Sequence, residues 1–195
     1  MVNATKKSPN VVSFVVKKVN DTKQTSVPVW KKAIHVFAIA ALVVAGLNFP
    51  ATVTNAATTG FQVPGATHTP NDWDISTVAN VQTSDNVYAT DNDEDEQGYS
   101  NFGFSVTAGS NISGIEVKVE AKASDSSGCQ LETRLSWNNG TSNTSVKTAA
   151  LTSSDVVYTF GSSSDTWGRT WASTEFTNAN FVVKVAYDDV SGNNC

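Results

Sequence analysis

Apolar and polar residues alternate with a period of two over several short stretches in the second half of the chain. The clearest stretch runs from Ile115 to Ala123, where apolar residues occupy every second position and Glu116, Lys118, Glu120 and Lys122 occupy the others. Successive side chains of a strand point to opposite faces, so the pattern predicts a strand with one buried and one solvated face. Acids and bases alternate on the solvated face, which disfavours pairing with other chains at an edge.

Similar patterns mark further strands. Residues 131–137 repeat the alternation, and Asn138-Asn139-Gly140 follows them. Asn-Gly supplies the positive φ angles of a tight hairpin turn, so we expect residues 141–147 to return beside 131–137. The segments 102–106, 156–160 and 181–187 predict three more strands. No stretch of this half has the spacing of three and four that an amphipathic helix needs.

Half-solvated strands are antiparallel, and six or more of them must bury their apolar faces against each other. We therefore expect an all-β domain, an antiparallel two-sheet β-sandwich with a jelly-roll-like path favoured over an immunoglobulin-like Greek key. Residues 188–194 have the composition of a turn, and the sequence offers no strand after them. Either the sheet ends in an open edge or the domain is truncated at its C-terminus, and we favour truncation.

The N-terminal part has the order of a secretory signal. Basic residues, among them Lys31 and Lys32, precede the apolar run 36–47, which Pro50 and small residues follow. Twelve apolar residues suit a signal helix, whereas a spanning helix takes about 20. We expect a leader over 1–57, cleaved after Ala56 or Ala57, with an uncleaved anchor as the alternative. A linker over 58–71, rich in glycine and proline, then leads into the domain at 72–195.

Basic and acidic residues are distributed unequally on the two sides of the predicted signal. Seven of the thirteen basic residues precede the apolar run, whereas seventeen of the eighteen acidic residues lie after Ala57. The exported part therefore carries a formal charge of about −11. Such a surface repels phosphate backbones and anionic lipids, which argues against nucleic acid as a partner and leaves the leader as the only contact with a membrane.

Both cysteines, Cys129 and Cys195, lie in the exported part. In an oxidising compartment a bridge between them would close a loop of about 65 residues and stabilise the fold by roughly 4 kcal/mol. We expect this disulfide, with two free thiols as the alternative.

The most acidic segment is residues 91–96, with five carboxylates among six residues. Oxygen donors at alternate positions can bind Ca²⁺, so Asp91, Asp93 and Asp95 are candidate metal ligands. The match to an EF-hand loop fails, because Glu96 stands where that loop needs glycine. A solvated acidic loop without a metal is the other interpretation.

The candidate ligand site is the aromatic segment 167–171. Trp167 and Trp171 offer flat faces on which sugar rings stack, with Arg169 and Asn178 as polar partners. Burial of both rings in the core is the alternative, since five Trp in a small domain must mostly be covered. Catalytic residues are not apparent: the exported part has one histidine, His68, and it lies in the expected linker. We expect no enzymatic activity.

Two passages resemble exported bacterial β-sandwich modules of large surface proteins. Asn101-Phe102-Gly103-Phe104-Ser105-Val106 with the later Gly114-Ile115-Glu116-Val117 is similar to one of their motifs. Trp167-Gly168-Arg169-Thr170-Trp171, with Asn178, Asn180 and Phe181, is similar to another. The resemblance covers the chain from about Ala79 onward. It implies a jelly-roll-like module, one among several in a cell-surface protein, which commonly continues into a further aromatic-rich strand; it implies no catalytic residues.

The sequence therefore predicts a non-catalytic secreted or cell-surface module for adhesion or ligand binding, with glycans as the favoured ligand and Ca²⁺ as a possible ion. Two alternatives stay open. The module is a building block of a surface layer, stalk or filament that contacts neighbouring modules, or it is an accessory module of a larger extracellular hydrolase.

Overall fold

The computed structural model describes residues 10–21, 57–91, 94–124 and 128–190, and the side chains from Thr59 onward. Its elements are almost all strands: β1 (Asn10–Asp21), β2 (Ala57–Gln62), β3 (Ala66–Asn71), β4 (Ala89–Thr90), β5 (Glu96–Ser100), β6 (Ile112–Lys122), β7 (Cys129–Ser136), β8 (Lys147–Ala150), β9 (Val156–Gly161) and β10 (Val182–Asp189). Two 3-10 helices, η1 (Val78–Val81) and η2 (Ser173–Glu175), complete the list. The expectation of an all-β domain is confirmed.

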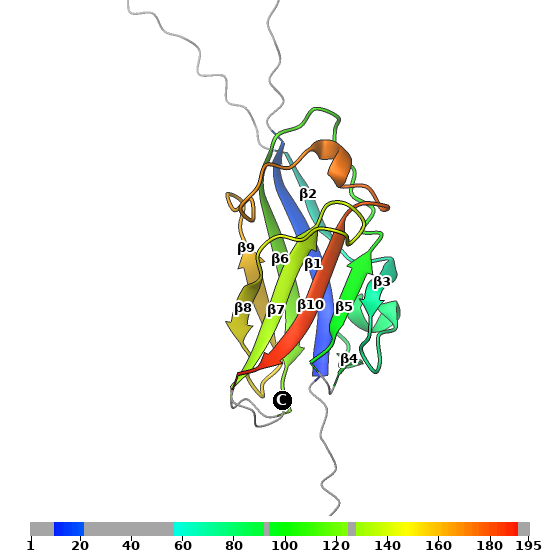
Figure 1. The fold of residues 1–195 in the computed structure, drawn as a ribbon, viewed down its shortest axis with the longest axis vertical. Coiled ribbons are helices and arrows are strands. Elements are labelled where there is room, and N and C mark those ends of the chain that lie inside the picture. The colour runs from blue at the N-terminus through cyan, green and yellow to red at the C-terminus, as the bar shows by residue number, and fades with distance from the viewer. Residues whose placement is uncertain (1–9, 22–56, 92–93, 125–127, 191–195) are drawn as a thin grey trace, which may run out of the picture.

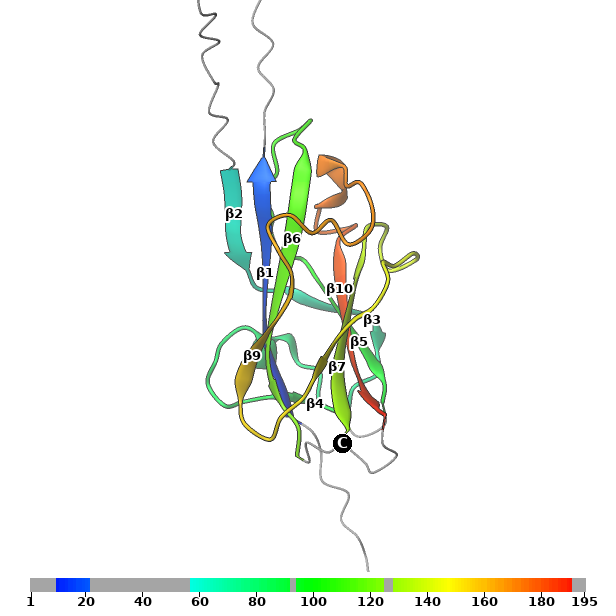
Figure 2. The same cartoon turned by 90° about the vertical axis from the view of Figure 1, so that its left-hand side faces the viewer.

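The strands form two antiparallel sheets of five strands each. Sheet A has the order β2-β1-β6-β9, with β4 pairing with one end of β1, and sheet B has the order β3-β5-β10-β7-β8. Figure 2 shows the two sheets as separate layers, with sheet A on the left and sheet B on the right. Figure 1 looks through both layers, with β7 and β10 in front of β6 and β1.

The core lies between the layers and follows the alternation in the sequence. Ile115, Val117 and Val119 of β6 are fully buried, as are Leu131 and Leu135 of β7. Burying each of these side chains contributes about 1.5–3 kcal/mol. The core positions of β10 are Val183, Val185 and Tyr187, and none of these side chains is more than 4% exposed. The predicted strands over 115–123, 131–137, 156–160 and 181–187 thus exist, with bounds shifted by a few residues.

The predicted strand over 102–106 is wrong. The strand of this region is β5, which ends at Ser100, and the residues that follow it form a loop. Asn101 and Gly103 have φ angles of 61° and 66°, a left-handed backbone that interrupts a pleated ladder. Phe102 is nevertheless 3% exposed, because the loop folds its ring into the core.

The hairpin after β7 is longer than the sequence predicts. Asn139 and Gly140 do adopt positive φ angles of 58° and 80°. The strand that pairs with β7 begins only at Lys147, however, and the intervening residues contribute a single bridge between Ser136 and Asn143. A turn of Asn-Gly type is therefore present, within a connection of about ten residues rather than two.

The prediction of a linker over residues 58–71 needs correction. Residues 58–71 contain most of β2 and all of β3, so they belong to the two sheets. Their glycines and prolines lie in a turn and in irregularities of these strands.

The final strand that the structure describes has no open edge. β10 lies between β5 and β7, with strand partners on both sides. The prediction of a truncated domain rests on an unpaired final strand, and this premise is wrong.

β1 comes from the region predicted to be a signal leader. It pairs antiparallel with β6 on one side and with β2 on the other. The predicted signal helix over 36–47 lies outside the described residues. Within the ranges described above, no helix is long and apolar enough to cross a membrane.

Candidate functional site

The aromatic segment after β9 forms a tight loop whose two indoles are buried. Trp167 is 5% exposed and Trp171 is 3% exposed. The Trp167 Nε1–H donates a hydrogen bond to the carbonyl oxygen of Ile115 at 2.9 Å, and the Trp171 Nε1–H donates to that of Thr166 at 2.7 Å. Both rings thus fill the core and have their polar atoms satisfied within the chain, as the alternative interpretation from the sequence states.

Two local features hold Trp167 in place. A Cβ at Gly161, whose φ is 73°, would clash with the Ile115 carbonyl oxygen and lie 2.7 Å from the Trp167 indole nitrogen, so only glycine fits between them. Asp165 accepts a hydrogen bond from the Trp167 backbone N–H at 2.8 Å, and its carboxylate lies 2.8 Å from Lys147 Nζ. The hydrogen bond with Lys147, followed by that from Trp167, holds the pKa of Asp165 below its ordinary value.

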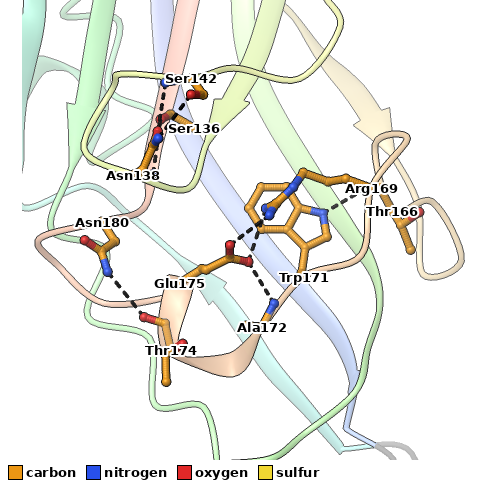
Figure 3. Close-up of polar contacts among 10 residues, drawn as sticks. All are labelled: Ser136, Asn138, Ser142, Thr166, Arg169, Trp171, Ala172, Thr174, Glu175 and Asn180. Carbon is orange, nitrogen blue, oxygen red and sulfur yellow. Dashed lines mark hydrogen bonds and ion pairs between the residues drawn. The ribbon is translucent and has the colours of Figure 1, made fainter.

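Arg169 is enclosed by aromatic rings and a carboxylate. Its guanidinium carbon lies 3.9 Å from the ring centroid of Trp137 and 4.4 Å from that of Trp171. Its two terminal nitrogens lie 3.1 and 2.8 Å from the two carboxylate oxygens of Glu175. The same carboxylate accepts a hydrogen bond from the Ala172 N–H at 2.7 Å, as Figure 3 shows. Arg169 therefore fixes the loop through a paired contact in which Glu175 engages two of its five N–H donors.

These residues belong to an aromatic cluster at one end of the molecule. Phe176 and Phe181 stack with ring centroids 5.1 Å apart, and Trp171 lies 5.5 Å from Phe176. Phe104 meets Phe176 edge-on at 6.0 Å and stacks on Phe102 at 5.7 Å. The cluster joins two loops that are far apart in sequence, one before β6 and one before β10.

A groove of about 490 Å³ lies between these two loops. One wall comes from residues 103–108 and the other from residues 173–178. Hydrogen bonds tie the walls together: the Gly103 N–H donates to Asn178 Oδ1 at 2.9 Å, and the Gly109 N–H donates to Ser173 Oγ at 3.1 Å. The lining residues are Gly103, Phe104, Val106, Ala108, Ser173, Thr174, Phe176, Thr177 and Asn178.

The lining combines apolar and neutral polar groups. Phe104, which is half-buried, supplies aromatic surface, and Phe176 lies beneath it with 3% of its surface exposed. The hydroxyls of Thr174 and Thr177 and the amide of Asn178 supply hydrogen-bonding groups. None of the lining residues carries an ionisable side chain. A groove of this chemistry suits an uncharged ligand with one apolar face and several hydroxyls.

The structure thus places one of the four predicted ligand residues, Asn178, on this groove. Trp171 contacts the lining residue Phe176, and Arg169 stacks on Trp171. Trp167 is not a lining residue, and its indole nitrogen binds the carbonyl oxygen of Ile115. Sequence reasoning missed Phe104 and Phe176 as lining residues. The passage from Trp167 to Phe181 indicates the region, but only the packing of the loops shows which aromatic ring reaches the surface.

The predicted calcium ligands are only partly described. Asp91 is 1% exposed, and its Oδ2 accepts a hydrogen bond from the Asp95 N–H at 2.9 Å. Asp93 lies outside the described residues. In the part of the chain that the structure describes, no three carboxylate, histidine or cysteine side chains are grouped closely enough to hold a metal ion. Calcium binding here stays a prediction, as does the disulfide: Cys129 is buried at the start of β7, and Cys195 lies outside the described ranges.

The outer face of sheet B carries the main cluster of charges. Lys184, which is 7% exposed, lies 3.2 Å from Glu96, and Glu96 also pairs with Arg134. Burial raises the pKa of Glu132 above its ordinary value, and the nearby carboxylate of Asp188 raises it further. These charges are largely matched within the sheet, so the face offers little unpaired charge to a ligand.

A second cavity, of about 420 Å³, lies beside this face and includes His68, Asn139 and Lys184 in its lining. The His68 Nε2 lies 2.8 Å from Asn139 Oδ1, and its Nδ1 lies 2.6 Å from the carbonyl oxygen of Thr69. Both ring nitrogens therefore bind groups of the chain itself, and His68 joins β3 to the turn after β7. We regard the groove at the aromatic end as the better candidate site.

Comparisons with known proteins give no relatives: no protein-family profile, no curated protein and no solved structure matches this chain.

Proposed function

We propose that this chain is an exported, non-catalytic module with a jelly-roll-like β-sandwich, and that it binds carbohydrate in the groove between residues 103–108 and 173–178. The observation that carries this proposal is the lining, in which aromatic surface from Phe104 lies beside neutral hydroxyl and amide groups. Sugar rings present the same combination, with C–H groups on one face and hydroxyls around the rim. The secreted or cell-surface location rests on the order of the leader.

A glycan array tests the ligand class. Soluble protein is applied with and without Ca²⁺, and glycans that bind are measured again with variants. Phe104→Leu keeps an apolar side chain but removes the flat ring, and we expect it to weaken binding at least tenfold. Thr174→Ala removes one rim hydroxyl and should weaken binding severalfold.

Thr148→Ala, on the exposed surface of β8 and away from the groove, is the matched control and should bind like the wild type. Absence of binding to every glycan in both conditions would refute carbohydrate as the ligand. If Phe104→Leu binds glycans as tightly as the wild type, the glycan site lies elsewhere on the molecule.

Export is tested separately, by fractionating cells and sequencing the N-terminus of the mature protein. We expect the mature chain to begin at Ala57 or Thr58. Cleavage after Ala56 leaves β2 whole, since this strand begins at Ala57. A full-length protein retained with the cells would favour the uncleaved anchor.

The second candidate is a building block of a surface layer, stalk or filament, and one observation favours it. β1 is an inner strand of sheet A, yet it comes from the region ahead of the predicted signal. A sheet that needs a strand from outside the exported domain is suited to joining modules. Electron microscopy of the exported protein distinguishes regular assemblies from isolated particles.

A further inference from the structure

β1 occupies a slot in the middle of sheet A. It pairs with β2 over Val16–Asp21 and with β6 over its whole length, antiparallel in both cases. Among the described residues, β2 pairs with no strand other than β1. Figure 2 shows β1 between β2 and β6, so these two strands flank the slot that β1 fills.

The slot cannot stay empty without a large cost. One edge of β6 pairs with β9, and the other pairs with β1 at ten residue positions between Ile112 and Lys122. The core-facing residues of this strand, including Ile115, Val117 and Val119, are fully buried. Without β1, the backbone donors and acceptors along this edge lose their partners, at about 1–3 kcal/mol for each group that stays buried. An edge of this length also recruits other strands.

The order of segments decides what can fill the slot after export. Residues 10–21 precede the apolar run 36–47, whereas β2 begins at Ala57. A leader removed after Ala56 or Ala57 takes residues 10–21 with it, and an uncleaved anchor holds them on the cytoplasmic side. In both cases the exported domain keeps β2 and β6 but not β1.

We propose that the slot between β2 and β6 is a strand-acceptor site, which takes an extended apolar segment of a partner protein once the domain has been exported. This inference rests on the export part of the proposed function and is independent of the groove. In the structure, residues 10–21 occupy the site and show the geometry of the incoming strand.

The register defines the chemistry of the partner segment. Lys18 lies opposite Ile115, a buried position of β6. Val11, Phe14 and Val16 lie opposite Ala121, Val119 and Val117, three further buried positions. Residues paired across a sheet lie on the same face, so these register positions require apolar residues. The partner is therefore an extended segment of about ten residues, antiparallel to β6 and apolar at the register positions of Val11, Phe14 and Val16. Backbone hydrogen bonds supply affinity and the apolar positions supply specificity.

The register positions that face the outer side of the sheet accept polar or charged residues. Val15 lies opposite Lys118, a half-buried residue on the outer face of β6. An acidic residue at this position would face a lysine across the pair, which is favourable. This difference between Val15 and Val16 gives a matched pair of test peptides.

The experiment uses the full chain, with a recognition sequence for a site-specific protease inserted between residues 21 and 57. After cleavage, a fluorescent peptide of residues 10–21 is added, and its uptake is followed by anisotropy. We expect uptake at one peptide per chain. The uncut chain should take up at least tenfold less peptide, because a tethered strand competes at millimolar effective concentration.

The peptides report on the register. The Val16→Asp peptide places a charge opposite buried Val117 and should lose at least a hundredfold in affinity. The Val15→Asp peptide is the matched control and should bind within severalfold of the wild type. Hydrogen exchange should show protection of β6 amides by the wild-type peptide.

Solubility gives a readout that does not depend on a folded empty domain. If the cut protein precipitates when its leader fragment is removed, the wild-type and Val15→Asp peptides should keep it soluble and the Val16→Asp peptide should not. Equal behaviour of the two aspartate peptides, or a cut chain that stays protected along β6 and takes up no peptide, would overturn the proposal. Either result leaves glycan binding and export to be decided by their own tests.

Discussion

Replacing Arg169 by Met tests the support of the groove most directly. The methionine keeps an apolar side chain between Trp137 and Trp171 but loses the charge and every donor. The paired hydrogen bonds with Glu175, 3.1 and 2.8 Å long, contribute about 1.5–3 kcal/mol because both partners are charged. Stacking on the rings of Trp137 and Trp171 adds about 0.5–1 kcal/mol for each ring.

We therefore expect Arg169→Met to lower the free energy of unfolding by about 3 kcal/mol, measured by urea denaturation. For a domain of this size the melting temperature should fall by about 6–12 °C. Glu175→Gln keeps an acceptor for the Ala172 N–H and should cost about 1 kcal/mol. A double-mutant cycle between the two positions should give a coupling energy of about 1–2 kcal/mol.

The control is Glu116→Gln, which removes a carboxylate whose ion pair with Lys118 is 3.5 Å long and partly exposed. Such a pair contributes less than about 0.5 kcal/mol. If Arg169→Met costs no more than this control, or if the cycle shows no coupling, the ion pair and the ring contacts do not hold the loop as argued.

Three further predictions follow from the fold. Glu132→Gln should stabilise the protein at pH 7, since the raised pKa means that folding disfavours the Glu132 charge. Unfolding curves should show this gain shrinking as the pH falls towards the ordinary glutamate pKa of 4.5, and absent at lower pH, where the wild-type carboxyl is protonated in both states. Gly161→Ala should cost at least about 3 kcal/mol, because its φ is positive and the new Cβ would clash with the Ile115 carbonyl oxygen and the Trp167 indole. Gly109→Ala, also at positive φ but in open space, should cost about 1 kcal/mol in the same assay. Exported protein denatured without reductant should show no thiol at Cys129 or Cys195 by alkylation and mass spectrometry, and a labelled thiol at both positions would refute the disulfide.

The strands that could be predicted from the sequence are those with one solvated face. In β6 and β7, every second residue is charged or polar because it faces water, and this alternation is visible without any structure. The alternation of apolar and polar residues does not predict β5. Its residues at 97–100 are buried on both faces, and the more apolar residues that follow it belong to a loop whose left-handed backbone at Asn101 and Gly103 no alternation reveals.

The pairing of strands was harder to foresee than their existence. The residues of β1 are rich in valine, which favours a strand, but their partners lie about 40 and 100 residues away. Similarly, the turn after Asp189 looks like a strand end without a neighbour, yet β10 has two neighbours that precede it in the chain. Patterns along a chain give the face of a strand but not its position in a sheet.

The residue types in the candidate site likewise do not show which side chains are exposed. Tryptophan suits both a sugar platform and a core, and composition cannot separate the two uses. Trp167 and Trp171 became core residues because their indole N–H groups reach backbone carbonyls inside the fold. Phe104 has no polar atom that needs a partner, and its place in a loop leaves it half-exposed beside the groove.

The groove and the slot use different residues, and this separation matters for both proposals. The groove is lined by residues 103–108 and 173–178, whereas β1 pairs with residues of β2, β4 and β6. A ligand at the loops therefore leaves the strand edge free, and a donated strand covers none of the groove lining. Binding and assembly are thus compatible in one molecule. A module joined to its neighbour through sheet A would still present its aromatic end, so the two functions need not be alternatives.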